Sequence, residues 1–296
     1  MKINSPDQIK YYLELSKLKI MIPVTLTGFT GYFIFDPHLS LNIILVSTGI
    51  LFLAIAASIL NQVQEATLDS KMNRTRNRPI PAQNIRISAV MIFFLFAFLA
   101  GIILIYYAGN LNAAIIGLVT LIWYNGIYTY SKRITRFAVV VGAVTGALPP
   151  VIGWVAAGGK ILDQQIVLLG FLLFMGQIPH FWLLIMKYGE EYKDAGMPSL
   201  IAVLEPAQIG RLIFSWVAFA VISALFLWFF KVIQTVIIII VMLIASLILI
   251  WQFIDLLKIQ ETNVDSKKYL LLLNSYFLLI LLLLISDRII QRIHFY

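Results

Sequence analysis

Nine long apolar runs constrain this chain more than any other feature. A helix that spans a bilayer needs roughly 20 mostly apolar residues, and nine segments reach or approach that length. They are Ile20–Phe35, Leu41–Leu60, Ile87–Tyr107, Leu111–Tyr130, Phe137–Ala157, Ile166–Met186, Leu212–Phe230, Val232–Phe253 and Tyr269–Ile285. Only 12% of the residues are charged, about half of what a soluble domain uses to cover its surface. The sequence therefore predicts an all-α integral membrane protein with nine transmembrane helices in a lipid bilayer.

The distribution of positive charge predicts how these helices are oriented. Cytoplasmic loops of membrane proteins carry an excess of Lys and Arg. With the N-terminus placed in the cytoplasm, all but four of the 22 Lys and Arg residues fall on that side, and the exceptions are Lys160, Lys231, Arg288 and Arg292. We therefore expect a cytoplasmic N-terminus and an extracytoplasmic C-terminus. Because topology accounts for the net charge of +8, no nucleic-acid partner is needed.

Two missing features narrow the chemistry and the location. The sequence has no cysteine, which excludes disulfides, thiolate metal sites and a cysteine nucleophile. Residues 1–20 mix acids and lysines with isolated apolar residues, unlike a cleavable signal peptide, so we expect the first membrane helix to be retained. The lack of a transit peptide favours a multi-pass protein of a prokaryotic inner (plasma) membrane.

Polar residues that begin inside the second apolar run predict a metal site. Asn61, Glu65 and Asp69 are spaced four residues apart, which on a helix places them in one narrow stripe. Their carboxylate and amide oxygens are ligands that Mg²⁺ prefers, and protein-bound Mg²⁺ commonly bridges one or two carboxylates to substrate phosphates. Basic residues follow at positions 71 to 78 and could contact phosphate oxygens. The pattern suits ionisation of a diphosphate; alternatively, the acids are a hydrated helix end and the basic run only sets topology.

A second acidic segment follows the sixth apolar run. Glu190 and Glu191 are adjacent, so on a regular helix they point about 100° apart and need not share one metal ion. Two acidic segments separated by four helices are expected where two four-helix halves face a shared cavity. The alternative is a solvated loop of mixed charge.

These polar segments resemble the UbiA superfamily of intramembrane prenyltransferases, and among its branches they are most similar to haem O synthase (protohaem IX farnesyltransferase). The stretch from Asn61 to Pro79 is similar to the first aspartate-rich motif of the superfamily. The stretches from Gly146 to Trp154 and from Gln177 to Phe181 are similar to segments in the fifth and sixth helices of the haem branch. The matching segments spread from about residue 11 to residue 200.

The resemblance implies a single UbiA-type domain over residues 1–296, with the nine helices around a central cavity. It implies transfer of a farnesyl group from farnesyl diphosphate to a vinyl group of haem B, giving haem O, with Mg²⁺ as cofactor and a downstream haem-modifying enzyme as a candidate partner. Asn61, Glu65 and Asp69 would be catalytic and would hold the metal together with Glu190 and Glu191. Candidate contacts to the diphosphate are Lys17, Lys19, Lys71, Arg74, Arg78, Lys132 and Arg133.

His180 is a candidate contact to the acceptor. It follows a proline inside a membrane helix, where a neutral imidazole could bind a haem iron or hydrogen-bond a propionate. The alternative is a histidine whose hydrogen bonds are satisfied within the helix bundle and whose role is structural.

Two other functions fit parts of the sequence. One is a prenyltransferase of the same type that acts on a quinone precursor or another tetrapyrrole. The other is a transporter of a small anion, which would need ionisable residues on both sides of a site at the middle of the membrane. The charged clusters lie on one side, which disfavours the transporter.

Overall fold

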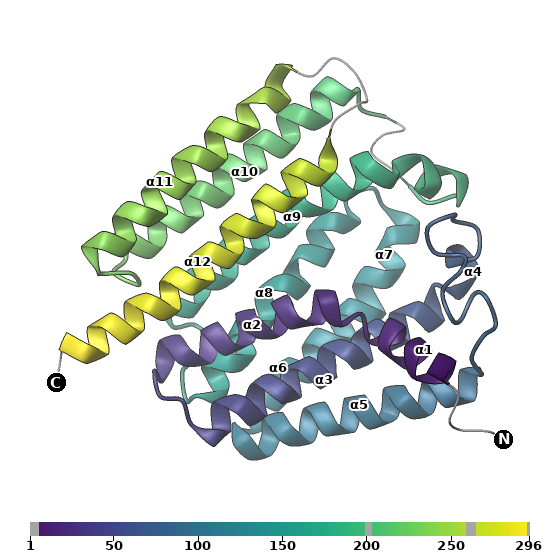
Figure 1. The fold of residues 1–296 in the computed structure, drawn as a ribbon, viewed down its shortest axis with the longest axis horizontal. Helices are drawn as coiled ribbons and strands as arrows, with labels where there is room; N and C mark the ends of the chain where they lie inside the picture. Colours follow the sequence, from purple (N-terminus) through teal and green to yellow (C-terminus); the bar gives the residue numbers. More distant parts are fainter. Residues whose placement is uncertain (1–5, 199–202, 259–264, 295–296) are drawn as a thin grey trace.

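The computed structural model describes residues 6–198, 203–258 and 265–294, and within these ranges all regular structure is helical (Figure 1). Nine described helical segments are long and apolar enough to cross a membrane, which confirms the nine predicted spans. They are α2 (Leu18–Phe35), α3 (Leu41–Gln64), α5 (Ile87–Ala108), the continuous segment Leu111–Ile134, α8 (Ala138–Ala156), α9 (Gln164–Asp194), α10 (Pro206–Phe229), α11 (Val236–Phe253) and α12 (Ser266–His294).

The segment Leu111–Ile134 consists of three pieces that run on without a break. It begins as α6 (Leu111–Ile122), widens into a π-helical turn (Trp123–Tyr128), and ends as α7 (Thr129–Ile134). Three shorter helices complete the description: α1 (Pro6–Ser16), α4 (Ala66–Asp69) and a 3-10 turn (Ile254–Lys258). Residue spacing predicted neither α1 nor the π-helical turn.

Several helices extend beyond the apolar runs from which they were predicted. The clearest case is α9, which continues past Met186 to Asp194, so that the second acidic segment is part of a helix and not the alternative loop of mixed charge. The helix ends just before Gly196, whose φ of 78° lies in the left-handed region, and a glycine in this conformation is a common stop for a helix.

Neighbouring helices pack in pairs around the apolar interior. α3 lies along α5, α2 along α8, α8 along α9, and α9 along α10. The contact between α2 and α8 is close because it involves glycines: a Cβ on Gly31 would lie 2.0 Å from the carbonyl oxygen of Pro150, and one on Gly153 would lie 1.9 Å from that of Gly28. The outward faces are apolar as well. Ile92 and Phe96 of α5, for example, are 71% and 60% exposed, as expected of side chains that face lipid.

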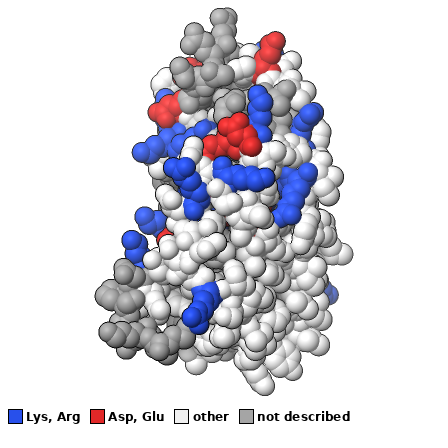
Figure 2. Space-filling view, turned by 90° about the vertical axis from the view of Figure 1, so that its right-hand side faces the viewer, with Lys and Arg blue, Asp and Glu red and all other residues white. Residues whose placement is uncertain are grey.

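Charged side chains and short helices gather at one end of the bundle. The helices α1, α4 and α7 lie together at the right of Figure 1, and the C-terminal end of α12 lies at the opposite end. Figure 2 faces the first of these ends and shows Lys and Arg side chains gathered around a smaller acidic group, above a large surface with few charges. The candidate site lies at this charged end.

Candidate active site

A cavity of about 220 Å³ opens at the charged end of the bundle. The segments that line it are the junction of α1 and α2, α3, α4 and the loop after it, the π-helical turn, α7 and the start of α8 with the residues between them, and α9 with the residues after it. The lining side chains belong to Lys17, Asn61, Glu65, Leu68, Asp69, Met72, Arg74, Arg78, Tyr124, Tyr128, Lys132, Thr135, Arg136, Ala138, Val139, Phe181, Leu184, Ile185, Met197 and Pro198. Segments far apart in the sequence therefore meet at one small chamber.

The stripe of Asn61, Glu65 and Asp69 lies along one wall of this cavity. The spacing suggested that one helix carries all three side chains. In the structure α3 ends at Gln64, and Glu65 adopts φ −99° and ψ 4° before α4 begins. The helical spacing nevertheless persists. The backbone N–H of Glu65 donates to the carbonyl oxygen of Asn61 at 2.9 Å, and that of Asp69 donates to Glu65 at 2.8 Å. The three side chains thus keep a common direction across the interruption.

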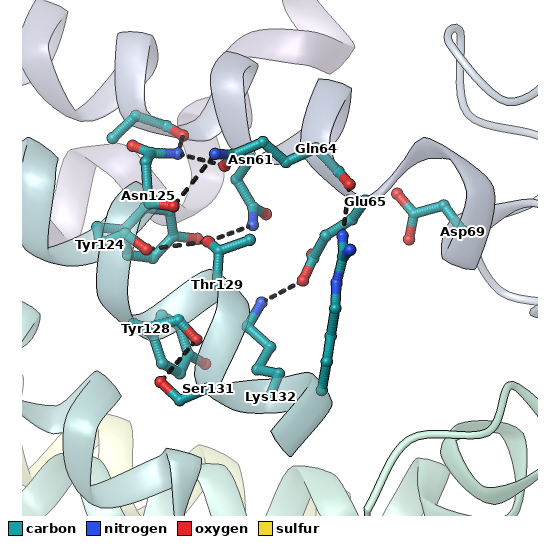
Figure 3. A network of polar contacts seen from close by, with 12 residues as sticks. Asn61, Gln64, Glu65, Asp69, Tyr124, Asn125, Tyr128, Thr129, Ser131 and Lys132 are labelled. Carbon is teal, nitrogen blue, oxygen red and sulfur yellow. Dashed lines mark hydrogen bonds and ion pairs between the residues drawn. The ribbon is translucent and has the colours of Figure 1, made fainter. Parts of the chain in front are cut away.

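Each carboxylate of the stripe has a cationic partner from another segment. Arg78 Nη1 lies 2.7 Å from Asp69 Oδ2, and Lys132 Nζ lies 2.8 Å from Glu65 Oε1 (Figure 3 shows the second pair). The loop that carries Arg78 is held against α4 because the buried Thr75 hydroxyl donates to the carbonyl oxygen of Asp69 at 2.9 Å. Both carboxylates and their cationic partners therefore line the same cavity.

The last turn of α3 is also bonded to the π-helical turn and to the start of α7 (Figure 3). Asn61 Nδ2 donates to Thr129 Oγ1 at 3.0 Å, and Gln64 Nε2 donates to the carbonyl oxygen of Asn125 at 3.1 Å. These bonds fix the end of α3 relative to α7 and hence bring Glu65 close to Lys132.

Lys17 reaches the cavity from the junction of α1 and α2. Its backbone is in the left-handed region, with φ 44° and ψ 44°, which is uncommon for a residue other than glycine. Burial lowers the pKa of the Lys17 amine to about 8, and the charge of Arg78 acts in the same direction, against the carboxylate of Asp69. Near neutral pH the amine is therefore charged but close to its titration.

The second acidic segment touches the loop after α4. Glu191 Oε2 accepts a hydrogen bond from the backbone N–H of Arg74 at 3.1 Å, and the guanidinium of Arg74 lies over the ring of Tyr188, 4.9 Å from its centre. Arg74, from the loop after α4, thus connects the first acidic segment to the second through its backbone and its side chain. Glu191 does not line the cavity, and the side chain of Glu190 lies outside the described residues.

Four of the predicted contact residues lie away from the cavity lining. Lys19 and Lys71 are exposed. Arg133 donates to the carbonyl oxygen of Gln64 at 2.7 Å. His180 Nδ1 lies 3.1 Å from Asn274 Oδ1 of α12, whereas its neighbour Phe181 faces the cavity.

Sequence reasoning missed three functional candidates that do line the cavity, namely Tyr124, Tyr128 and Arg136. Arg136 follows Lys132 by four residues, and this spacing could have suggested that both cations point the same way. The tyrosines belong to the π-helical turn, whose altered periodicity no simple pattern indicates.

The stripe has the chemistry of a partial Mg²⁺ site. Asn61, Glu65 and Asp69 offer hard oxygen ligands, and the ion pairs to Arg78 and Lys132 engage one oxygen of each carboxylate. No group of three or more His, Asp or Glu side chains within the described ranges could hold a metal ion by itself. The donor set therefore fits Mg²⁺ that is shared between the protein and substrate phosphates.

Comparisons with known proteins agree with this chemistry. The model of the UbiA prenyltransferase family matches residues 21–281. The protohaem IX farnesyltransferase of Oleidesulfovibrio alaskensis is 35% identical over 214 residues, which cover 72% of this chain and 76% of the relative. That of Geobacter sulfurreducens is 44% identical over 151 residues, covering 51% of this chain and 55% of the relative.

Solved structures resemble the fold over nearly its whole length. A structure of digeranylgeranylglyceryl phosphate synthase has a TM-score of 0.77 at 20% identity and covers 96% of this chain and 99% of its own. A UbiA homologue from Archaeoglobus fulgidus bound to GPP and Mg²⁺ has a TM-score of 0.66 at 16% identity, with coverage of 94% and 98%. At these identities the likeness concerns the fold.

Proposed function

We propose that this chain, which belongs to the UbiA prenyltransferase family, transfers a farnesyl group from farnesyl diphosphate to a vinyl group of haem B and so forms haem O. The protein is a multi-pass integral membrane prenyltransferase similar to protohaem IX farnesyltransferases. The names of those relatives support the farnesyl donor and the haem acceptor.

One observation carries the proposal: three side chains that offer carboxylate or amide oxygens and five cationic side chains line the same cavity. The oxygen donors are Asn61, Glu65 and Asp69. The cations are Lys17, Arg74, Arg78, Lys132 and Arg136. A diphosphate needs both kinds of group, because its oxygens bind cations directly and share a metal ion with carboxylates. The A. fulgidus homologue solved with GPP and Mg²⁺ supports this use of the fold.

The cationic side chains promote departure of the diphosphate. The allylic carbon–oxygen bond breaks and its electron pair leaves with the diphosphate, whose growing negative charge is stabilised by Lys17, Arg78 and Lys132. Charges arranged in advance around a leaving group contribute strongly to such reactions. When bound by Asn61, Glu65 and Asp69, Mg²⁺ would supply further charge neutralisation. Glu190 and Glu191 remain the sequence-based candidates for additional metal contacts.

The apolar side of the cavity suits the second half of the reaction. The rings of Tyr124, Tyr128 and Phe181 line it, and aromatic faces attract cations, so they can stabilise the allylic carbocation. The vinyl π-electrons attack this cation, water adds to the resulting cation on the acceptor, and a proton is released. We place His180 on the acceptor side, where its bond to Asn274 orients the imidazole toward haem iron or a propionate.

The setting of the enzyme is part of the proposal. The charge pattern supports a cytoplasmic N-terminus, an active site at the cytoplasmic face of the inner (plasma) membrane, and an extracytoplasmic C-terminus. The chain would act as one domain over residues 1–296 and could hand haem O to a downstream haem-modifying enzyme.

The deciding experiment incubates the purified protein with farnesyl diphosphate, Mg²⁺ and haem B and reads the products by mass. Haem O is the expected product. Prenylation of a quinone precursor or of another tetrapyrrole, but not of haem B, would move the assignment to the alternative acceptor. Flux of a small anion through proteoliposomes without any prenylated product would instead support a transporter.

A further inference from the structure

Thr129 occupies the junction between the metal-binding stripe and the π-helical turn (Figure 3). It is fully buried and does not line the cavity, so it is not placed to touch a substrate there. Its hydroxyl nevertheless joins two groups: the side-chain amide of Asn61 on α3, at 3.0 Å, and the carbonyl oxygen of Tyr124, at 2.9 Å.

The hydrogen-bonding capacity of a hydroxyl decides which end of the Asn61 amide faces Thr129. A threonine hydroxyl has one proton and two acceptor lone pairs. Its proton goes to the carbonyl oxygen of Tyr124, so toward Asn61 the oxygen can only accept. The amide must therefore present its NH₂ group to Thr129. Its oxygen is left as the end of the amide that can serve the cavity, which Asn61 lines.

The π-helical turn leaves a backbone carbonyl oxygen free to bond to α3 beside Asn61. The backbone N–H of Thr129 bonds to Tyr124, five residues back, and bypasses the carbonyl oxygen of Asn125. That oxygen accepts from Gln64 Nε2 at 3.1 Å instead, and Asn125 Nδ2 donates to the carbonyl oxygen of Ala57 at 3.1 Å. The last turn of α3 is thus fastened to the π-helical turn around Asn61. Single π-turns inside α-helices occur frequently at functional sites.

We propose that Thr129 is a positioning residue that selects the orientation of the Asn61 amide in which its oxygen, and not its NH₂ group, faces the Mg²⁺–diphosphate. The inference rests on the proposed function and adds a determinant of metal binding to it. Without the Thr129 oxygen, the amide could turn by half a rotation and offer two N–H donors to a cation, which cannot bind them. Partners behind metal ligands typically affect metal affinity by about 10- to 100-fold.

The test measures Mn²⁺ binding to the purified full-length protein by electron paramagnetic resonance, in the presence of the unreactive thiolo analogue of farnesyl diphosphate. Thr129→Val keeps the shape of the side chain and removes its oxygen, and we expect the Kd for Mn²⁺ to rise about tenfold or more. Thr129→Ser keeps the oxygen and should stay within about twofold of the wild type. Turnover of Thr129→Val should recover when Mg²⁺ is raised.

Thr120→Val is the matched control. Thr120 lies on the same membrane span and its hydroxyl also donates to a backbone carbonyl oxygen, that of Ile116 at 2.7 Å, but it takes no part in the bonds to α3. Its Kd should not change. The proposal is overturned if Thr129→Val binds Mn²⁺ like the wild type, or if Thr129→Ser loses as much affinity as Thr129→Val.

A double-mutant cycle separates orientation from general damage. Asn61→Asp carries an oxygen at both ends of the side chain, so the loss of the Thr129 oxygen should cost little Mn²⁺ affinity in that background. An equally large loss there would refute the orienting role. If Thr129→Val is not monodisperse, the experiment uses Thr129→Ala, which removes the same oxygen. Failure of the wild type to bind Mn²⁺ with the analogue would count against the proposed function itself.

Discussion

Two buried aspartates lie at opposite ends of the bundle and are used in different ways. Asp287, on α12, is fully buried and accepts from the backbone N–H groups of Gln234 and Thr235, at 3.1 and 2.8 Å, and from the side chain of Gln291. Its donors hold the start of α11 against α12. Asp69 is 2% exposed, faces a cavity, and has an ion pair to a side chain on a loop.

The difference teaches that burial alone does not identify a functional carboxylate in a membrane protein. Both residues are costly to bury, and both have partners. Asp287 is surrounded by donors that belong to the fold, whereas Asp69 retains an oxygen that can serve a ligand. We therefore expect substitution of Asp69 to reduce activity more than stability, and substitution of Asp287 to reduce stability more than activity.

The largest expected effect is the loss of turnover in Asp69→Asn. Removing this charge from the proposed metal site should lower kcat by roughly 10³-fold, on the scale of a lost electrostatic contact to the transition state. The thermal midpoint in detergent should stay within a few degrees, because the helices that form the bundle do not depend on this carboxylate. Haem O formation, followed by mass, measures the effect; normal turnover at saturating Mg²⁺ would remove Asp69 from the site.

Asp287→Ala should show the reverse pattern. Two backbone N–H groups at the start of α11 would lose their acceptor, at a cost on the order of 3 kcal/mol. The midpoint of thermal unfolding should fall while kcat of the surviving protein is retained. Asp287→Asn keeps an acceptor oxygen and serves as the control, with a smaller loss. A selective loss of turnover without a loss of stability would break the contrast between the two ends.

Within the charged end, Lys132 and Arg133 offer a sharper comparison because they are adjacent. Lys132 lines the cavity and pairs with Glu65, whereas Arg133 donates to a backbone carbonyl oxygen and lies over the ring of Tyr130. Lys132→Ala should lower kcat/KM for farnesyl diphosphate by about 10- to 100-fold, the value of a hydrogen bond to a charged group. Arg133→Ala should change it by less than about threefold. Steady-state kinetics with both variants measures these effects. A larger loss of kcat/KM in Arg133→Ala than in Lys132→Ala would contradict the assignment of the two residues.

The smallest expected effect concerns pH. Because the pKa of Lys17 is lowered to about 8, the amine is mostly protonated at pH 7 and mostly neutral at pH 9. The KM for farnesyl diphosphate should therefore rise several-fold across this interval. Lys17→Arg keeps its charge through the interval and should flatten the rise. An unchanged profile in Lys17→Arg would show that another group titrates.

The sequence predicts the membrane architecture well because hydropathy over roughly 20 residues is a strong physical signal. It also predicts the stripe of Asn61, Glu65 and Asp69, since spacing by four residues survives the break at Glu65. The outcome for the cations is mixed. Lys132 and Arg78 line the cavity, but Arg133 is directed to Gln64, and adjacent basic residues carry no signal that separates the two directions.

The positions that spacing could not predict depend on tertiary contacts. The π-helical turn departs from the regular helical period over Trp123–Tyr128, and Tyr124 and Tyr128 of this turn line the cavity. The hydrogen bond of His180 to Asn274 joins residues 94 positions apart. Neither a period of 3.6 residues nor a charge count contains such information.

The glycine contact between α2 and α8 has a consequence for how this enzyme could change its specificity. Gly31 lies 14 residues after Lys17, and Gly153 lies 14 residues after Val139, so each glycine is about 20 Å along its helix from a residue that lines the chamber. A methyl group added at this crossing would change the angle between the two helices, and a small change of angle displaces their distant ends further than the crossing itself. The size of the cavity could therefore be adjusted by substitutions that never touch a substrate.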